Sequence, residues 1–363
     1  MSNRTWQRRL SRVALVIVIL GTGVAGLELA FGNWLEPNRM NRLNLLRDVE
    51  LTYATASLYP GAPDHITYTR DRYGLRGGYA DPSQIDILTI GGSATDQRYI
   101  ADGQTWQDVL AAGLSRPEQR VVVVNAGVDG QSTIGHLRNF EWWFPYVPGL
   151  KPRFVLYYIG VNDFLVRAAN DDLIAAPSLL TTLRHSSALY AAAVKARGLY
   201  RARVSAGLGH TRIDFSQVAW TRQPTLANPA PVLQPFEQQY RERLRLLMAR
   251  TNALGAKPIC VTQASRYYRD EGTDVVGVAQ PILFGDAWVN GVDFFRIMIA
   301  LDQALFDECR AAGGVTLDAA RQVSWTDADF YDFLHNTPAG ARKLGEYLQA
   351  GLRPYFEGVV RSR

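Results

Sequence analysis

The chain has 363 residues, of which 47% are hydrophobic and 20% are charged, a composition that fits a folded globular protein and excludes a disordered or low-complexity chain. Its 39 basic and 34 acidic residues give a net charge of +5, but the basic residues are scattered, so nucleic acid is not expected as a partner. The 2 cysteines exclude a disulfide-dense scaffold and a cysteine-based zinc site.

An apolar stretch near the N-terminus predicts a membrane-spanning helix. Residues 13–32 are apolar except for Thr22 and Glu28, and at ~1.5 Å per residue they form a helix about 30 Å long, enough to cross a bilayer. The residues before this stretch favour a cytoplasmic N-terminus, because they include Arg4, Arg8, Arg9 and Arg12. We therefore expect residues 1–32 to anchor the protein in the membrane, with its body in the periplasm or another extracytoplasmic space.

This stretch allows two other interpretations. Gly23-Val24-Ala25 loosely resembles a signal-peptide cleavage site. Residues 21–26 also match the G-x-G-x-x-G pattern of dinucleotide-binding folds, which would indicate an oxidoreductase. That pattern requires a helix and a second strand to follow. The following segment is polar and contains Pro37, so the dinucleotide interpretation is disfavoured.

The body alternates short apolar runs with segments in which apolar residues recur at helical spacing. The runs are residues 86–90, 121–124, 154–159, 258–262 and 314–317. Continuous apolar strands separated by amphipathic helices indicate a parallel sheet covered on both faces. We therefore predict an α/β fold of the flavodoxin-like kind, with three α/β/α layers and a central parallel sheet of about five strands.

The predicted domain organisation has three parts. Residues 1–32 form the anchor, residues 33–84 a juxtamembrane lead, and residues 85–363 a single domain. Within the domain, residues 165–234 are rich in Ala, Arg and Leu and exceed an ordinary strand-to-helix connection. We expect them to be a helical insertion.

Polar residues follow the predicted strands at the edge where open parallel sheets bind their ligands. Ser93 comes after two glycines at the end of the first run, Gly130 lies in the loop after the second, and Asn162 follows the third. Asp332 and His335 lie three residues apart, just before the predicted last helix. This spacing allows the carboxylate to hold the imidazole.

These four blocks, in this order, resemble those of the SGNH (GDSL-type) serine hydrolase superfamily, over about residues 68–352. The resemblance implies Ser93 as nucleophile, His335 as base and Asp332 as its orienting partner. It also implies an oxyanion hole formed by the N–H groups of Ser93 and Gly130 and the side-chain amide of Asn162. Residues 68–77 look like an upstream stretch of membrane-attached and secreted members. The sequence departs from the family pattern at the two neighbours of the serine, which are Gly92 in place of Asp and Ala94 in place of Leu.

The resemblance implies acyl transfer through an acyl-enzyme, with carbohydrate or lipid esters of the cell envelope as substrates. Water as acceptor makes an esterase and a sugar hydroxyl makes an O-acyltransferase, here an acetyltransferase, and the sequence leaves both open. Beyond the substrate and the membrane, proteins of polysaccharide modification are the expected partners, and neither a cofactor nor a metal is expected. The alternative is a non-catalytic module of the same fold that binds glycan or lipid, which is disfavoured because every triad member is present.

The other histidines and the cysteines are interpreted as structural. The histidines outside the blocks share no metal-ligand spacing and are interpreted as surface or core residues: His65, His136, His185 and His210. Cys260 lies in a predicted buried strand, so an unpaired thiol is favoured over a disulfide with Cys309.

Three further groups were considered for the site. Asp163 is expected to cap or brace its loop. Trp142 and Trp143 are expected in the core or an interface. Residues 266–268, Arg-Tyr-Tyr, either line the acyl or glycan site or form a solvated loop.

Overall fold

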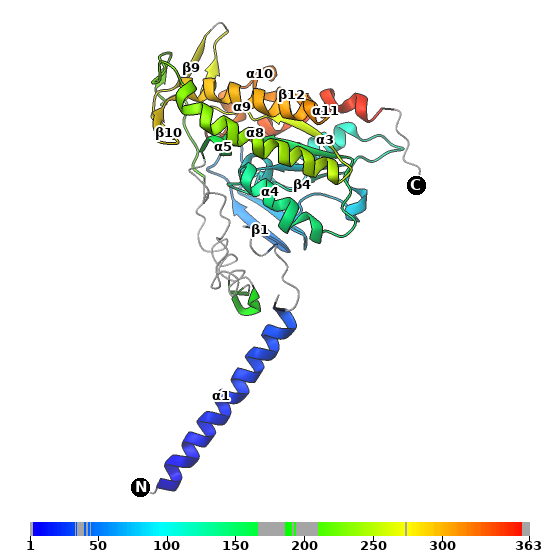
Figure 1. The fold of residues 1–363 in the computed structure, drawn as a ribbon, viewed down its shortest axis with the longest axis vertical. Helices are drawn as coiled ribbons and strands as arrows, with labels where there is room; N and C mark the ends of the chain where they lie inside the picture. The colour runs from blue at the N-terminus through cyan, green and yellow to red at the C-terminus, as the bar shows by residue number, and fades with distance from the viewer. Residues whose placement is uncertain are drawn as a thin grey trace.

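The computed structural model describes residues 3–32, 34, 40, 43, 45–165, 186–190, 192–193, 210–272 and 274–357. It shows an α/β body from which one long helix, α1 (Asn3–Phe31), projects (Figure 1). Most of the predicted insertion at 165–234 lies outside the described residues. Within its described part, residues 210–229 form a loop with the two-residue strand β6 (Trp220–Thr221), and helix α8 (Ala230–Ala253) begins at its end.

The central sheet confirms the predicted fold class. It is a 5-stranded sheet with the strand order β12-β7-β5-β3-β4, and all of its neighbouring strands are parallel. Each strand overlaps one of the apolar runs. The strands are β3 (Ile87–Gly91), β4 (Val123–Asn125), β5 (Phe154–Ile159), β7 (Lys257–Thr262) and β12 (Val315–Leu317).

Helices cover both faces of this sheet, because successive strand side chains point to opposite sides. In β5, Val155 and Tyr157 pack with helices α4 (Thr133–Trp142), α8 and α9 (Gly291–Ala311). Leu156 and Tyr158 pack on the other face, with α3 (Trp106–Leu114) and α11 (Pro338–Leu352). The two tryptophans at the end of α4, Trp142 and Trp143, are buried in the first of these cores, as expected.

Short elements complete the body. Helix α2 (Ser93–Asp96) follows β3, α5 (Val161–Leu165) follows β5, and α10 (Ala319–Gln322) follows β12. Strand β6 pairs with β9 (Val275–Val278), which pairs with β8 (Tyr268–Asp270). Two antiparallel hairpins stand outside the main sheet and are formed by β10 (Ile282–Phe284) with β11 (Ala287–Val289) and by β1 (Val49–Ala54) with β2 (His65–Arg70).

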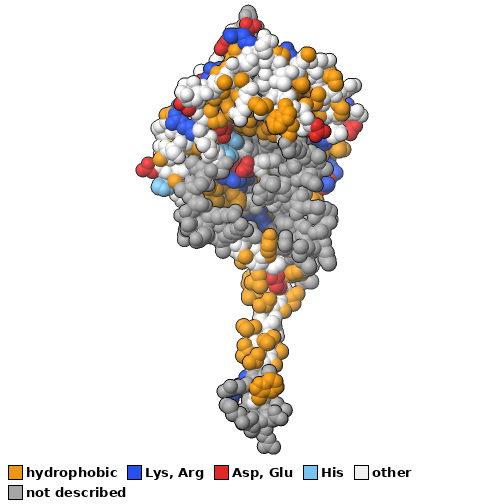
Figure 2. Space-filling view, turned by 90° about the vertical axis from the view of Figure 1, so that its left-hand side faces the viewer, with side chains coloured by type: hydrophobic (Ala, Val, Ile, Leu, Met, Phe, Trp, Pro, Cys, Tyr) orange, Lys and Arg blue, Asp and Glu red, His pale blue; other side chains and the backbone are white. Residues whose placement is uncertain are grey.

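The N-terminal helix has the length and composition of a membrane span. Within α1, residues Ser11–Phe31 are long and apolar enough to cross a bilayer, and Figure 2 shows hydrophobic side chains along the projecting helix. Near its C-terminal end, the Glu28 carboxylate accepts hydrogen bonds from the Ser187 hydroxyl and the Ala188 N–H. The end of α1 therefore contacts residues of the predicted insertion.

The cysteines correct one expectation. The favoured unpaired thiol is wrong, because Cys260 of β7 and Cys309 of α9 form a disulfide. Helix α9 packs on the face of β7 to which Cys260 points, and this brings the two Cα atoms to 6.3 Å. The cysteines are 49 positions apart in the sequence, and no local pattern indicated that they are close in space.

Candidate functional site

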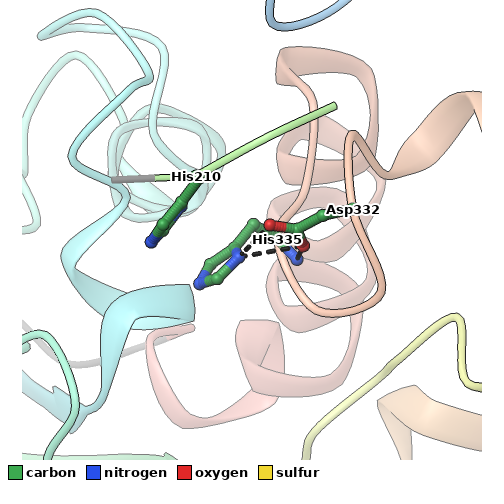
Figure 3. A group of neighbouring side chains, drawn as sticks. All are labelled: His210, Asp332 and His335. Carbon is green, nitrogen blue, oxygen red and sulfur yellow. Dashed lines mark hydrogen bonds and ion pairs between the residues drawn. The ribbon is translucent and has the colours of Figure 1, made fainter. Parts of the chain in front are cut away.

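Ser93, His335 and Asp332 form one chain of hydrogen bonds. Ser93 is the first residue of α2 and is separated from the carboxyl end of β3 by Gly92 alone, and its Oγ lies 2.7 Å from His335 Nε2. His335 Nδ1 lies 2.7 Å from one carboxylate oxygen of Asp332 and 2.9 Å from the other (Figure 3). Because Nδ1 faces a carboxylate, we assign the ring proton to Nδ1, which donates a hydrogen bond to Asp332. The lone pair of Nε2 is then free to accept a hydrogen bond from the Ser93 hydroxyl.

The Asp332 carboxylate is held in its ionised form. The backbone N–H groups of Leu334 and His335 donate to it at 2.8 Å each. Burial raises the pKa of Asp332, but the hydrogen bond and charge of His335 and these two N–H groups outweigh burial, and the pKa is lowered. A carboxylate that stays charged can fix the imidazole orientation, and it would stabilise an imidazolium if His335 took a proton.

The three expected oxyanion donors are the N–H groups of Ser93 and Gly130 and the Asn162 side chain, and they belong to the segments that follow β3, β4 and β5. Asn162 Nδ2 donates to the Gln131 carbonyl at 2.8 Å and lies against Gly92, where an added β-carbon would overlap it. Gly130 has φ of +78°, which favours glycine. Within the described part of the chain, the N–H groups of Ser93 and Gly130 donate to no backbone carbonyl. They are therefore available to a ligand.

A buried ion pair between Arg70 and Asp96 holds the last residue of helix α2, the helix that begins at Ser93. Arg70 of β2 donates to an Asp96 carboxylate oxygen and to the Gly127 carbonyl, both at 2.6 Å, and the Tyr68 hydroxyl donates to the same Asp96 oxygen at 2.7 Å. The side chains of Arg70 and Asp96 are each 2% exposed. The resemblance singled out the segment that contains Arg70. It gave no sign that this segment contacts the helix of Ser93.

Asp163 braces the loops, as expected. Its carboxylate accepts the Thr133 hydroxyl at 2.5 Å and the Thr133 N–H at 3.2 Å, and it pairs with Arg243 at 3.6 Å. The contact joins the start of α4, which follows Gly130 and Gln131, to α5, which carries Asn162. Asp163 thus links the two segments that bear the proposed oxyanion donors Gly130 and Asn162.

Residues 266–268 lie against the loop of Asp332 and His335. The Arg266 N–H donates to the Phe333 carbonyl at 2.6 Å, and the Tyr267 ring stacks on the Phe333 ring at 4.7 Å between centroids. The Arg266 guanidinium pairs with Asp327 at 2.6 Å. Of the two sequence interpretations, the solvated loop is therefore wrong for Arg266, which is buried.

His210 is a neighbour of the proposed triad that no sequence motif indicated. Its ring stacks on His335 at 4.0 Å between centroids, and its Nδ1 lies 2.9 Å from the Tyr331 hydroxyl. Burial and the neighbouring His335 lower the pKa of His210 to about 4. No local pattern could have found this contact, because His210 lies far from His335 in sequence. The other described histidines lie elsewhere, His136 in the core and His65 on the surface.

The chain is similar to a known protein family and to several solved structures. A sequence model described as "GDSL-like Lipase/Acylhydrolase family" matches residues 89–343, which is more than half of the chain. Among similar solved structures, an acetyl xylan esterase from Geobacillus stearothermophilus has 15% identity and a TM-score of 0.42, and the match covers 77% of this chain and 100% of that one. A lipase/acylhydrolase from Enterococcus faecalis has 13% identity and a TM-score of 0.40, with 75% and 97% covered. No curated protein matched the sequence.

Proposed function

Because this chain belongs to the GDSL-like lipase/acylhydrolase family, we propose that it cleaves acyl esters through Ser93, His335 and Asp332. The observation that carries the proposal is the hydrogen-bond chain from Ser93 Oγ through His335 to Asp332, in which both contacts of the imidazole are 2.7 Å long. A serine hydroxyl is a weak nucleophile at neutral pH and needs an adjacent base, which is the role that this geometry suits.

In the first half of the reaction, Ser93 Oγ attacks the ester carbonyl carbon and its proton passes to His335 Nε2. The tetrahedral intermediate then collapses, His335 returns the proton to the leaving alcohol oxygen, and the acyl group stays on Ser93. In the second half, His335 takes a proton from water or from a sugar hydroxyl, whose oxygen attacks the acyl carbon. The product leaves when His335 returns that proton to Ser93 Oγ.

The negative oxygen of each tetrahedral intermediate would be stabilised by the N–H groups of Ser93 and Gly130 and by Asn162 Nδ2. In comparable enzymes, one such donor is worth about 3 to 4 kcal/mol of transition-state stabilisation. Asn162 Nδ2 carries two hydrogens, of which one is donated to Gln131. The second is available to the substrate.

We further propose that α1 anchors the protein and that residues beyond it work outside the cytoplasm. The apolar helix Ser11–Phe31 and the arginines before it support this orientation. The Cys260–Cys309 disulfide fits an oxidising compartment. An enzyme in that place would act on acyl esters of envelope carbohydrates or lipids, alone or with proteins of polysaccharide modification. The division into an anchor at 1–32, a lead at 33–84 and a domain at 85–363 belongs to the same proposal.

Active-site labelling tests the catalytic part of the proposal. A fluorophosphonate probe should label the full-length protein in detergent, and Ser93→Ala should abolish both the label and the hydrolysis of p-nitrophenyl acetate. Ser83→Ala is the matched control, because Ser83 is exposed in a short 3-10 helix, Pro82–Gln84, and it should keep both. A label that survives in Ser93→Ala would contradict the assignment. Product analysis with an acetyl donor and candidate glycans then separates hydrolysis from transfer.

A further inference from the structure

One histidine beside the triad has no role in the acyl-transfer steps. His210 reaches the site from a part of the chain remote from both β3 and the loop of Asp332, and its ring lies nearly parallel to that of His335, with an interplanar angle of 24° (Figure 3). Its Nδ1 faces the Tyr331 hydroxyl. Its Nε2 makes no hydrogen bond to the described part of the chain.

His210, His335 and Asp332 have the composition of a transition-metal site. One ligand atom from each lies within 4.8 Å of the other two. Two imidazoles and a carboxylate are a ligand set that Zn²⁺ takes readily. Ligand atoms on one tetrahedral zinc ion lie about 3.4 Å apart, given zinc–ligand bonds of ~2.0–2.1 Å. The His210 and His335 rings stack nearly parallel, so the His210 ring must rotate out of the stack before the lone pairs of all three ligands point at one ion.

The surroundings allow an ion to enter. All three side chains are partly exposed, so an ion can reach them from solvent and keep a water molecule as its fourth ligand. The Tyr331 hydroxyl lies 2.9 Å from Nδ1 of the His210 ring, which leaves Nε2 for the ion. A hydrogen bond of this kind orients an imidazole ligand and fixes which nitrogen is left for the metal.

We propose that His210, His335 and Asp332 form an inhibitory site for Zn²⁺ or a similar transition-metal ion. Both nitrogens of His335 have a part in the triad, since Nε2 faces Ser93 and Nδ1 faces Asp332. An ion on Nε2 displaces the Ser93 hydroxyl and occupies the lone pair that would accept its proton. An ion on Nδ1 breaks the hydrogen bond to Asp332 that orients the ring. The serine then keeps its proton and does not attack. The inhibition rests on the proposed ester hydrolysis, whereas the metal site itself does not.

Zinc titration tests the inhibition. Full-length protein in detergent is first treated with a chelator, and hydrolysis of p-nitrophenyl acetate is then followed against ZnCl₂, with each variant normalised to its own zinc-free rate. The wild type should be inhibited. Even an outer-shell partner is worth about 10- to 100-fold in metal affinity, so His210→Gln should need at least about tenfold more zinc. His65→Gln, a change at an exposed histidine of β2, should respond like the wild type. Equal sensitivity of His210→Gln and wild type overturns the proposal.

Cobalt binding tests the site independently of activity. Co²⁺ replaces Zn²⁺ in such sites and absorbs visible light when bound by nitrogen and oxygen ligands. Wild type and Ser93→Ala should both develop the absorption bands, and His210→Gln should not at the same cobalt concentration. Bands that are absent from the wild type, or unchanged in His210→Gln, overturn the site. If no variant hydrolyses esters but the cobalt result is as expected, the proposed function fails and the metal site stands.

Discussion

Replacing Gly92 by alanine should impair catalysis while leaving the fold intact. Gly92 occupies the position where the family pattern has an aspartate, so by family comparison a side chain at this position is harmless. In this structure, a β-carbon at residue 92 would overlap Asn162 Nδ2. The amide is the end of a side chain and can move aside, so the fold tolerates the change. However, the amide then leaves the place from which it would reach the oxyanion.

The expected loss of activity and of stability in Gly92→Ala follows from the two contacts of the displaced Asn162 amide. Moving it breaks the 2.8 Å hydrogen bond to the Gln131 carbonyl, which costs about 1 kcal/mol of stability. If Asn162 is an oxyanion donor, its loss lowers kcat by about a hundredfold to a thousandfold. KM should change little, because the donor acts in the transition state more than in the ground state. Asn162→Ala should lower kcat by a similar factor.

The assay compares three variants by ester-hydrolysis kinetics and thermal unfolding. Gly92→Ala and Asn162→Ala should share the kcat defect and keep a Tm close to that of the wild type. Gly78→Ala is the matched control, since its β-carbon would meet only the flexible end of Arg120, at 3.2 Å. A Gly92→Ala enzyme that keeps its kcat while Asn162→Ala loses it would show that the amide is not held where the structure places it. If both keep it, Asn162 has no part in the oxyanion hole.

Four further changes have expected outcomes. Asp332→Asn should lower kcat by about ten-thousandfold, because an amide no longer selects the tautomer that the base needs; full activity would remove Asp332 from the triad. Arg70→Met should lower the free energy of unfolding by about 3 to 5 kcal/mol in urea titrations, because it leaves its carboxylate partner buried without that guanidinium. Burial raises the pKa of Asp302 to about 7 although an arginine lies 2.9 Å away. The contribution of Asp302 to the free energy of unfolding is fully present below about pH 4 and is lost as pH rises through about 7, by up to about 4 kcal/mol. Asp302→Asn should remove this pH dependence from the free energy of unfolding. Replacing both Cys260 and Cys309 by alanine should cost about 2 to 4 kcal/mol of stability under oxidising conditions; an unchanged Tm would argue against the disulfide.

Several features of the fold and site could be predicted because they depend on local patterns. Continuous apolar runs such as residues 154–159 predicted buried parallel strands, and all five runs coincide with strands of one sheet. In a parallel sheet the carboxyl ends of the strands meet at one edge. Motifs that follow different strands therefore predict a single site, and the structure brings Ser93 and His335 within hydrogen-bond distance. The order of the blocks along the chain was therefore enough to predict that Ser93 and His335 belong to one site.

Other contacts could not be predicted, because a periodic pattern shows which face of an element is buried but not what lies opposite. Cys260 was predicted on a buried face, yet only the packing of α9 against β7 brings Cys309 to it. Likewise, the segment of Arg70 was noticed for its motif, and only the tertiary structure pairs it with Asp96 beneath the serine helix.

The sequence by itself determined the fold class, the order of the strands along the chain and the residues at the ends of those strands, because apolar periodicity and short motifs are local properties. Only the tertiary structure decided what surrounds the proposed triad, such as the stacking of His210 on His335. The physical reason is that such contacts form between segments whose approach depends on the packing of the whole domain, and neither segment carries a local signal of its partner.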